Sequence, residues 1–599
     1  MHPPKLSKFL QFDQSLLAAG GLFGGFSLKL VGEDASFFLV ALVSCLEVVL
    51  NCNPLSGDDV GEALVRLGEK RKGFAGVVAL GLQCTVWLVA MVEQPHTFDT
   101  TATRLVEGIR QEVTAFAPNI PAVYELHFGI PMAGAILSAL NTRLDATMLA
   151  LLLEQLEAKI IFVYHEFIEV VHEALNIVSQ RSRTSYYVSK PPQLVVIAEF
   201  DQTLKNTPAG SLDYNGLIAM GKADFEPIRP HNECDPISVN YTSGSTGIPK
   251  GAIYSHRAAY LNSLATIFHC DMRQMPVFLW TVDMFRCNGW CFAWAVAALG
   301  GTNIFLGTDL SAKLIFNAIL THKVTHLCGA PAILKIIADA PTSDWWPIPS
   351  TVDIIVAGTL PAAQVLKKVT ELGFNVSHGY GMTEALGPAI VEPLQYSSTI
   401  DEQTKTIKRR EGIHNLIMDG VDVKDPNTMK SIACDGKTVG EVMFKGNTMM
   451  LGYLKNTKAT QEAFKGGWYR TGDLAIRHVD GCIQMKDRAK DIINSSGGEV
   501  ISTLEVEAVL LSHPKVMEAA VVGRVGDDNV GETPCAFVKL KEEGCSACMA
   551  KEIIEFCGDR LPNYMVPHSV VFGDLPINST GKIQKFVLRE KINAMAIAN

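Results

Sequence analysis

The stretch YTSGSTGIPKGAIYSH, Tyr241–His256, places five hydroxyl-bearing residues, three glycines and one lysine in its first eleven positions. A strand-like segment, PISVNYT (236–242), leads into it, so the loop should lie at the edge of a sheet. Backbone N–H groups and hydroxyls in such a loop can surround a phosphate. An ordinary turn explains the composition equally well when the stretch is taken alone. The spacing excludes a Walker A loop, because Gly251 stands where that motif needs a magnesium-binding hydroxyl.

The chain around this loop alternates helix-like and strand-like segments. Buried strands are predicted at 160–164 and 352–358, and helices at 144–159 and 362–373. Such alternation predicts an α/β domain with parallel sheets that are covered by helices.

The pattern changes beyond Asp487. Ser502 and Glu505 have the spacing of a capping box at the start of a helix, and strands are predicted at 516–524 and 535–540. We therefore predict a small mobile α+β C-terminal domain. The junction KDRAKDII (486–493) is short, polar and charged, which suits a hinge between domains.

Length and composition limit the class of protein. A chain of 599 residues predicts two or three domains, and the formal net charge of -10 argues against a nucleic-acid partner. The fourteen cysteines are scattered, as in a reduced cytosolic protein. The C-terminal letters AMAIAN are not a peroxisomal S-K-L address, so we predict a cytoplasmic location.

The first 95 residues form a divergent hydrophobic segment. Residues 74–92 carry no charge and follow a basic cluster at 70–72. As a helix this run would be about 28 Å long, close to the thickness of a bilayer core. Buried strands and a core helix of an α/β domain give the same run, and we favour that interpretation. Membrane association through residues 36–92 stays open as the alternative.

Five further motifs follow the loop in order: HGYGMTE (378–384), GEVMFKGNTMMLGY (440–453), GGWYRTGD (466–473), KDRAKDIINSSGGEVIS (486–502) and INSTGKIQK (577–585). With the loop, this set resembles the adenylate-forming, or AMP-binding, superfamily. Within that superfamily the plant acyl-activating enzymes are the most similar, on three further segments: APNIPAVYELHFGIPMAGAILSALNTRLD (117–145), VKDPNTMKS (423–431) and GETPCAFVKL (531–540). The resemblance implies a large AMP-binding domain over residues 96–488 and a C-terminal domain over residues 489–599.

The resemblance also implies a reaction. A carboxylic acid would attack the α-phosphate of Mg²⁺-bound ATP to give an acyl-adenylate, and the thiol of coenzyme A would then displace AMP. The expected activity is that of an AMP-forming acid–thiol ligase acting on a short- or medium-chain, branched or aromatic acid. The protein would catalyse this reaction by positioning the acid and ATP and by stabilising the charge that develops between them.

The resemblance assigns roles to residues by their place in the motifs. The phosphates and the adenine of ATP would be held by Thr242, Ser243, Gly244, Ser245, Thr246, Lys250, His378, Gly379, Tyr380, Gly381 and Met382. Thr383 would bind the α-phosphate, and Glu384 together with Thr246 would coordinate Mg²⁺. Asp473 would accept from the ribose hydroxyls, and Arg488 would add a second contact.

The C-terminal domain would bring a catalytic cation. Lys582 would bridge the attacking carboxylate and the α-phosphate in the first step. The domain would then turn about Lys490, and a segment that contains Gly498 would face coenzyme A. The acyl pocket would be lined in part by MFRCNGW (284–290).

Two departures from the family pattern leave alternatives open. Arg286 stands where the family usually has a histidine that gates the route of coenzyme A. Its permanent charge could hinder thioester formation, or it could attract the carboxylate substrate or a phosphate of coenzyme A. Residues 1–114 do not resemble the family's N-terminal segment. A non-catalytic or adenylation-only nucleotide-binding protein, possibly tethered to a membrane, is therefore the competing interpretation.

Overall fold

The computed structural model describes residues 112–598 apart from several internal segments. Those segments are 182–190, 199–209, 223, 243–248, 274, 308–309, 342, 344–345, 359–360, 362, 397–406, 410–412, 415–416, 496–498, 526–530, 543–545 and 578–582. The apolar run 74–92 lies outside the described residues. Among the described helices, none is long and apolar enough to cross a bilayer.

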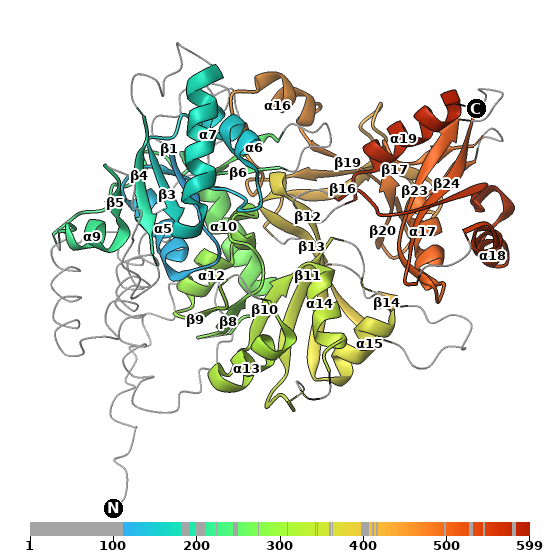
Figure 1. Cartoon of the computed structure of the whole chain (residues 1–599), viewed down its shortest axis with the longest axis horizontal. Coiled ribbons are helices and arrows are strands. Elements are labelled where there is room, and N and C mark those ends of the chain that lie inside the picture. The colour runs from blue at the N-terminus through green and yellow to red at the C-terminus, as the bar shows by residue number, and fades with distance from the viewer. Residues whose placement is uncertain are drawn as a thin grey trace, which may run out of the picture. The chain divides into compact units, whose positions relative to one another are not determined.

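The first eight-stranded sheet carries the phosphate-loop strand (Figure 1). Its strands are β1 (Glu112–Phe116), β2 (Ile136–Ala139), β3 (Ile160–Tyr164), β4 (Gln193–Ile197), β5 (Leu212–Asp213), β6 (Pro236–Tyr241), β7 (Gly251–Ser255) and β18 (Gly452–Tyr453). They lie in the order β18-β7-β6-β2-β1-β3-β4-β5. The neighbours from β6 to β5 are parallel, whereas β7 and β18 add antiparallel strands at the other edge.

The second sheet is also mainly parallel. Its strands are β8 (Val277–Trp280), β9 (Thr302–Phe305), β10 (His326–Gly329), β11 (Val352–Ala357), β12 (Phe374–Met382), β13 (Gly387–Tyr396), β14 (Ile407–Arg409) and β15 (Ile413–His414). The order along it is β14-β13-β12-β11-β10-β8-β9, and β15 pairs with β13. Strands β9, β8, β10, β11 and β12 are parallel, so their carboxyl ends meet at one edge.

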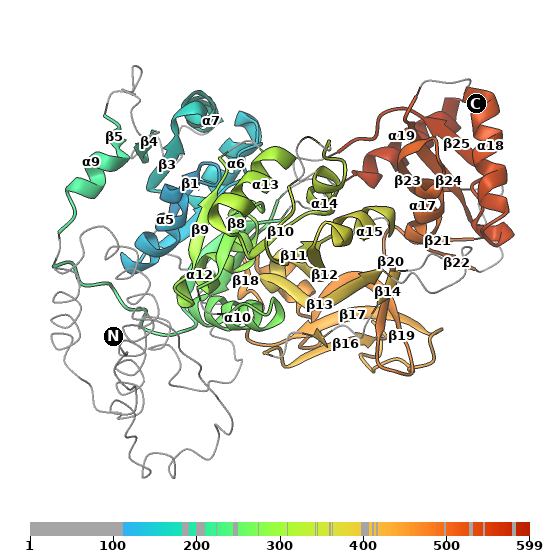
Figure 2. The same ribbon diagram turned by 90° about the horizontal axis from the view of Figure 1, so that it is seen from below.

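Helices cover both sheets, which confirms the predicted fold class. They are α5 (Pro121–Met132), α6 (Ala146–Leu156), α7 (Ile168–Arg181), α9 (Tyr214–Ala219), α10 (His256–His269), α11 (Cys287–Trp290), α12 (Phe292–Ala298), α13 (Ala312–His322), α14 (Pro331–Ala338), α15 (Ala363–Glu371) and α16 (Thr457–Ala463), with 3₁₀ turns η2 (His165–Phe167) and η4 (Thr383–Ala385). Helices α6 and α7 pack on the first sheet, and α13, α14 and α15 pack on the second (Figure 2). One apolar core joins α5 and α12 to strands of both sheets.

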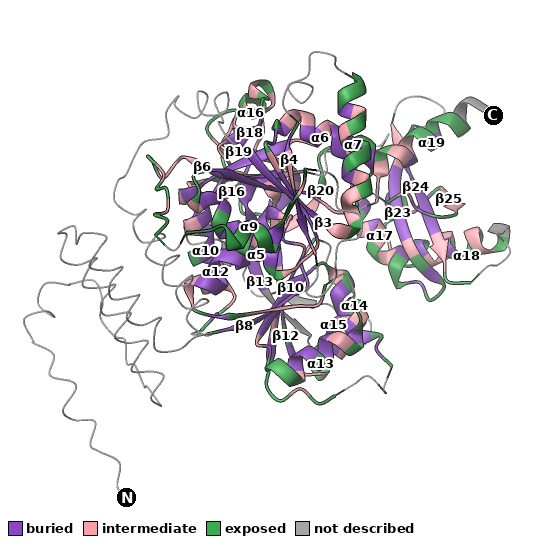
Figure 3. Cartoon of the chain, turned by 60° about the vertical axis from the view of Figure 1, so that its left-hand side comes forward, coloured by how far each residue is buried: buried purple, intermediate pink, exposed green. Residues whose placement is uncertain are grey.

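Two of these helices, α6 and α10, begin at a side-chain cap. Asp145 accepts a hydrogen bond from the backbone N–H of Met148 at the start of α6, and Ser255 does the same for Ala258 at the start of α10. The apolar side of α6 then faces the first sheet. Figure 3 shows the central strands as buried and the outer surfaces of α7 and α13 as exposed.

A third sheet was not predicted. It is antiparallel and contains β16 (Gly420–Lys424), β17 (Val439–Lys445), β19 (Tyr469–Arg477) and β20 (Ile483–Arg488), in the order β16-β17-β19-β20. Two of the quoted motifs, GEVMFKGNTMMLGY and GGWYRTGD, contribute β17 and β19 to this sheet. The large N-terminal domain therefore ends in an antiparallel sheet rather than in further parallel strands.

The C-terminal part has the predicted α+β composition. Its elements are β21 (Ile493–Asn494), β22 (Val500–Ile501), α17 (Thr503–Ser512), β23 (Val516–Val525), β24 (Glu532–Leu540), α18 (Ser546–Gly558), η5 (Asn563–Met565), β25 (Ser569–Phe572) and α19 (Lys585–Ala598). Helices α17 and α18 pack on one face of the β23-β24-β25 sheet, and α19 packs on the other. Ser502 caps α17 by accepting from the N–H of Glu505, but the Glu505 carboxylate pairs with Lys486. Only half of the predicted capping box is formed.

Candidate active site

The base of the phosphate loop is closed by two hydrogen bonds between its flanks, one between backbone groups and one to a side-chain hydroxyl. The N–H of Thr242, just after β6, donates to the carbonyl oxygen of Lys250, just before β7, over 2.9 Å. The N–H of Lys250 approaches the Thr242 hydroxyl at 3.4 Å. The loop therefore follows a strand, as predicted, and it returns to the sheet at the neighbouring strand β7. Four proposed phosphate-binding residues lie outside the described residues: Ser243, Gly244, Ser245 and Thr246.

Lys250 and Glu384 both contact one tyrosine. The Lys250 Nζ lies 4.3 Å from the ring centroid of Tyr453, and the Tyr453 hydroxyl donates to Glu384 Oε1 over 2.7 Å. Burial and the neighbouring Glu384 carboxylate raise the pKa of Tyr453, so the hydroxyl stays a donor. The phosphate loop, HGYGMTE and GEVMFKGNTMMLGY are separated along the chain, and they meet at Tyr453. Tyr453 was missed as a site residue, although it is the last letter of the quoted GEVMFKGNTMMLGY motif.

Glu384 itself is nearly buried, at 9% exposure. Backbone contacts hold its segment: the Tyr254 hydroxyl donates to the carbonyl oxygen of Thr383 over 2.6 Å, and the N–H of Met450 donates to that of Glu384 over 2.9 Å. Gly381 is needed just before this point, because a Cβ there would lie 2.1 Å from the carbonyl oxygen of Gly387. The Glu384 carboxylate therefore has a fixed position at the end of β12.

Tyr380 and Asp473 are in direct contact. The Tyr380 hydroxyl donates to Asp473 Oδ2 over 2.8 Å, and Arg488 Nε lies 3.3 Å from Asp473 Oδ1. Burial and the Asp473 carboxylate raise the pKa of Tyr380 well above its usual value. The antiparallel register of β19 and β20 places Asp473 opposite Arg488. The structure thus brings together the proposed adenine and ribose residues, and His378 is tied nearby to the carbonyl oxygen of Gly358 at 3.1 Å.

The predicted hinge is anchored on both sides of Lys490. Asp487 Oδ2 accepts from the N–H and the hydroxyl of Thr503, each over 2.6 Å, and Asp491 pairs with Arg589. Partial burial lowers the pKa of Lys490, and the nearby Arg488 contributes in the same direction. Gly498 and Lys582 lie outside the described residues, so their places in the site remain predictions.

The segment MFRCNGW contains an unusual left-handed turn. Five consecutive residues have positive φ: Cys287 (46°), Asn288 (46°), Gly289 (58°), Trp290 (53°) and Cys291 (64°). This conformation costs a non-glycine residue roughly 1–2 kcal/mol. Asn288 holds it in place, because its N–H donates to Asn240 Oδ1 over 2.8 Å and its Oδ1 accepts from the Ser238 hydroxyl over 2.6 Å. The turn is therefore fastened to β6, two residues before the phosphate loop begins.

Gly289→Ala should destabilise this turn. At φ +58° an added Cβ would lie 2.5 Å from Cζ3 of Trp280, a contact that requires the ring to move. We expect a loss of about 1–3 kcal/mol in the free energy of unfolding, measured by denaturant titration. Gly481→Ala is the matched control, because Gly481 has φ +89° and no atom within 4 Å of the added Cβ. Equal losses in the two variants would show that the contact with Trp280 does not matter.

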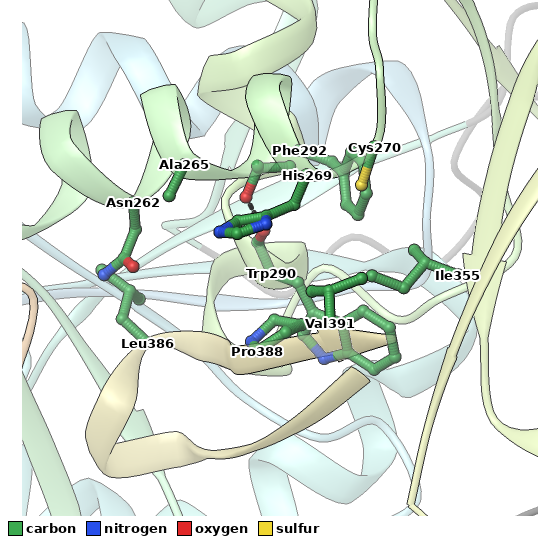
Figure 4. Close-up of a pocket in the computed structure, with 11 residues that line it drawn as sticks. Asn262, Ala265, His269, Cys270, Trp290, Phe292, Ile355, Leu386, Pro388 and Val391 are labelled. Carbon is green, nitrogen blue, oxygen red and sulfur yellow. Dashed lines mark hydrogen bonds between the residues drawn. The ribbon is translucent and has the colours of Figure 1, made fainter. Parts of the chain in front are cut away.

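A narrow cavity lies beside this turn, between α10 and β13 (Figure 4). Its walls include His269, Trp290, Ile355, Pro388 and Val391. About 10 Å³ is open to the centre of a water-sized sphere, which is close to the space for one water. Trp290 was predicted to line an acyl pocket. Most of the other walls come from α10 and β13, which were not predicted to contribute.

Comparison with known proteins agrees with this geometry. Residues 96–454 match the family of AMP-binding enzymes, and residues 505–582 match the AMP-binding enzyme C-terminal domain. The chain belongs to the AMP-binding enzyme family. This AMP-binding enzyme is 44% identical over 495 residues to a peroxisomal butyrate–CoA ligase of Arabidopsis thaliana, an alignment that covers 81% of this chain and 85% of that protein. It is 42% identical to a peroxisomal trans-cinnamate:CoA ligase of Petunia hybrida, with 81% and 85% covered.

The fold of this AMP-binding enzyme also occurs in solved structures. An anthranilate CoA ligase in complex with anthranoyl-AMP superposes with a TM-score of 0.66 and covers 87% of this chain and 92% of its own. The sequence identity is 22%, so this likeness concerns the fold alone. The predicted family and fold class are both confirmed. The boundary at residues 488–489 falls between the two matched ranges and stays a prediction.

Proposed function

We propose that the enzyme joins a short, branched-chain or aromatic carboxylic acid to coenzyme A, with conversion of ATP to AMP and pyrophosphate. The observation that carries this proposal is the convergence of Lys250, Tyr453 and Glu384 at the phosphate loop, with the Tyr380–Asp473 pair at the end of the same strand β12. The relatives named above are CoA ligases, which favours this function over the non-catalytic alternative.

The first step forms a bond between a carboxylate oxygen and the α-phosphorus, and the bond from that phosphorus to the bridging oxygen of pyrophosphate breaks. We assign Lys250 to the outer phosphates, Thr383 to the α-phosphate and Asp473 to the ribose. Lys582 neutralises charge between the acid and the α-phosphate. In the second step the sulfur of coenzyme A bonds to the acyl carbon, AMP leaves with the carboxylate oxygen, and the thiol proton passes to solvent.

The described residues fit a magnesium ion that is bound mainly by the nucleotide. Glu384 is a nearly buried carboxylate next to the phosphate loop, and a single carboxylate with substrate phosphates is a usual Mg²⁺ environment. Within the described part of the chain no group of three or more acidic, histidine or cysteine residues could hold a metal by itself. Bound Mg²⁺ would stabilise negative charge on the phosphates.

We place the acyl group against Trp290, where the cavity is narrow. The cavity has space for only about one water, so any acyl group placed there requires its wall side chains to move. We infer a compact acid from the bulk of Trp290 and Cys287 in the predicted acyl segment, not from the volume of this cavity. Cys287, another residue of the predicted acyl segment, is buried in the same turn.

The test is carboxylate-dependent ATP–pyrophosphate exchange over a panel from acetate to octanoate, with isobutyrate, benzoate and cinnamate. We expect exchange with at least one compact acid, and thioester when coenzyme A is added. Absence of exchange with every acid would contradict the proposed function. Exchange without thioester would restrict the function to adenylation.

Arg286→His should raise the coenzyme A-dependent rate several-fold and leave pyrophosphate exchange within about twofold. Arg286 is permanently charged and longer than the histidine expected at this position, so we propose that it slows the second step. The rates of exchange and of thioester formation are measured on the same preparations. An unchanged thioester rate in the variant would contradict this role of Arg286.

We also propose that the enzyme acts in the cytoplasm, although the two named relatives are peroxisomal proteins of plants. A fluorescent fusion with a free C-terminus, viewed beside peroxisomal and cytosolic markers, distinguishes the two compartments. Peroxisomal fluorescence would contradict the proposal.

A further inference from the structure

One carboxylate oxygen holds two arginines beside the left-handed turn. Asp283 Oδ2 accepts from Arg286 Nε over 2.9 Å and from Arg143 Nη2 over 2.7 Å. The guanidinium carbons of Arg286 and Arg143 lie 5.6 Å and 5.3 Å from the ring centroid of Phe285. The three charged side chains are about one-third to one-half exposed. Two cations and one anion leave the cluster with one net positive charge.

The Asp283 carboxylate stands on a fixed turn. Asn119 holds this turn from both sides: its Nδ2 donates to the carbonyl oxygen of Val282 over 2.7 Å, and its Oδ1 accepts from the N–H of Met284 over 2.9 Å. The N–H of Arg286 donates to the carbonyl oxygen of Asp283 over 3.0 Å. An aspartate has a short side chain with few rotamers, whereas an arginine loses about 2 kcal/mol of rotamer freedom when it is held. Asp283 therefore dictates where the arginine lies, and not the reverse.

The cluster adjoins the nucleotide site through the chain itself. Arg286 immediately precedes the left-handed turn, and Asn288 in that turn is bonded to Asn240 of β6. On the other side, Cys291 Sγ approaches the carbonyl oxygen of Leu386 at 3.6 Å, two residues after Glu384. A guanidinium keeps its charge at every accessible pH, so its position is the property that a neighbour can control.

We infer that Asp283 is a positioning residue that restrains Arg286 at the entrance of the acyl and thiol substrates, with Arg143 as the second anchor of the same carboxylate. This inference rests on the proposed function. Without the Asp283 charge, Arg286 keeps its cation but loses its fixed place, and it can lie across the path of the thiol. The first half-reaction uses Lys250, Glu384 and Asp473, whose contacts described above lie outside this cluster.

The restraint itself is tested without any substrate. The rates at which phenylglyoxal modifies individual arginines are measured by peptide mass spectrometry in the full-length protein and in Asp283→Asn. We expect modification of Arg286 and Arg143 to become at least about threefold faster. Asp271→Asn is the matched control, because Asp271 pairs with Arg273 on an exposed surface, and it should leave Arg286 and Arg143 unchanged. Equal rates for Arg286 in Asp283→Asn and in the unaltered protein would overturn the inference.

The consequence for the reaction is tested on the same variants. Asp283→Asn should lower the coenzyme A-dependent rate, or raise the KM for coenzyme A, by about fivefold while pyrophosphate exchange stays within about twofold. The double variant Asp283→Asn/Arg286→His should regain the rate of Arg286→His alone. An equal loss of rate in both half-reactions would overturn the role of Asp283. So would a double variant whose coenzyme A-dependent rate stays as low as that of Asp283→Asn. If no acid supports exchange in any variant, the proposed function fails, and the modification rates still decide whether Asp283 restrains Arg286.

Discussion

Lys582→Ala is expected to lower carboxylate-dependent ATP–pyrophosphate exchange by about 10²- to 10³-fold. The side chain would stabilise charge that develops only as the carboxylate approaches the α-phosphate, so its loss should act on the rate more than on the binding of ATP. The measurement is the exchange rate at saturating ATP and acid. The second half-reaction, started from a chemically prepared acyl-adenylate and coenzyme A, should remain within a fewfold of the unaltered enzyme.

Lys585, three positions further along, is the matched control for this prediction. Its Nζ lies 2.7 Å from Glu507 Oε1 and 2.6 Å from the Thr503 hydroxyl, inside the C-terminal part of the chain. Lys585→Ala should therefore destabilise the fold by about 3–5 kcal/mol, because it leaves the Glu507 charge without its partner. Lys582→Ala should leave the unfolding transition unchanged. An exchange rate near that of the unaltered enzyme in Lys582→Ala would contradict the role given to Lys582.

Glu384→Gln is expected to lower the exchange rate by about 10²-fold and to raise the Mg²⁺ concentration needed for half-maximal rate. The amide keeps the shape of the side chain and can still accept from the Tyr453 hydroxyl, but it lacks the charge that attracts the ion. Exchange is measured as a function of Mg²⁺ at fixed ATP.

Tyr453→Phe shows whether the charge of the Glu384 carboxylate or its orientation matters for the rate. It removes the 2.7 Å hydrogen bond to Glu384 and leaves the carboxylate intact. We expect a loss of about tenfold or less, with little change in the Mg²⁺ requirement. Equal Mg²⁺ dependence in Glu384→Gln and Tyr453→Phe would contradict a metal-binding role for Glu384.

The sequence predicted the elements whose pattern is local. The segment at 160–164 is a continuous apolar run, and it forms β3 as a buried parallel strand. Ser502 was placed at the start of α17 by its spacing from Glu505, and its hydroxyl does cap that helix. The order of the motifs identified the family, which the comparisons confirm.

What the sequence could not predict depends on contacts between distant segments. Arg143 and Asp283 are 140 positions apart, and no periodicity links them. The Tyr453–Glu384 contact joins two residues that are 69 positions apart and belong to different motifs. The left-handed turn at Cys287–Cys291 contradicts the local preference of its residues and persists because β6 fastens Asn288. These features are fixed by tertiary structure rather than by composition.

The most direct test of the proposed reaction follows the oxygen atoms of the acid. A substrate acid labelled with ¹⁸O in its carboxylate is turned over with ATP, Mg²⁺ and coenzyme A, and the AMP product is examined by mass spectrometry. If the carboxylate attacks the α-phosphorus, each AMP carries one ¹⁸O from the acid and the pyrophosphate carries none. Unlabelled AMP, or label in inorganic phosphate or pyrophosphate, would contradict an acyl-adenylate intermediate.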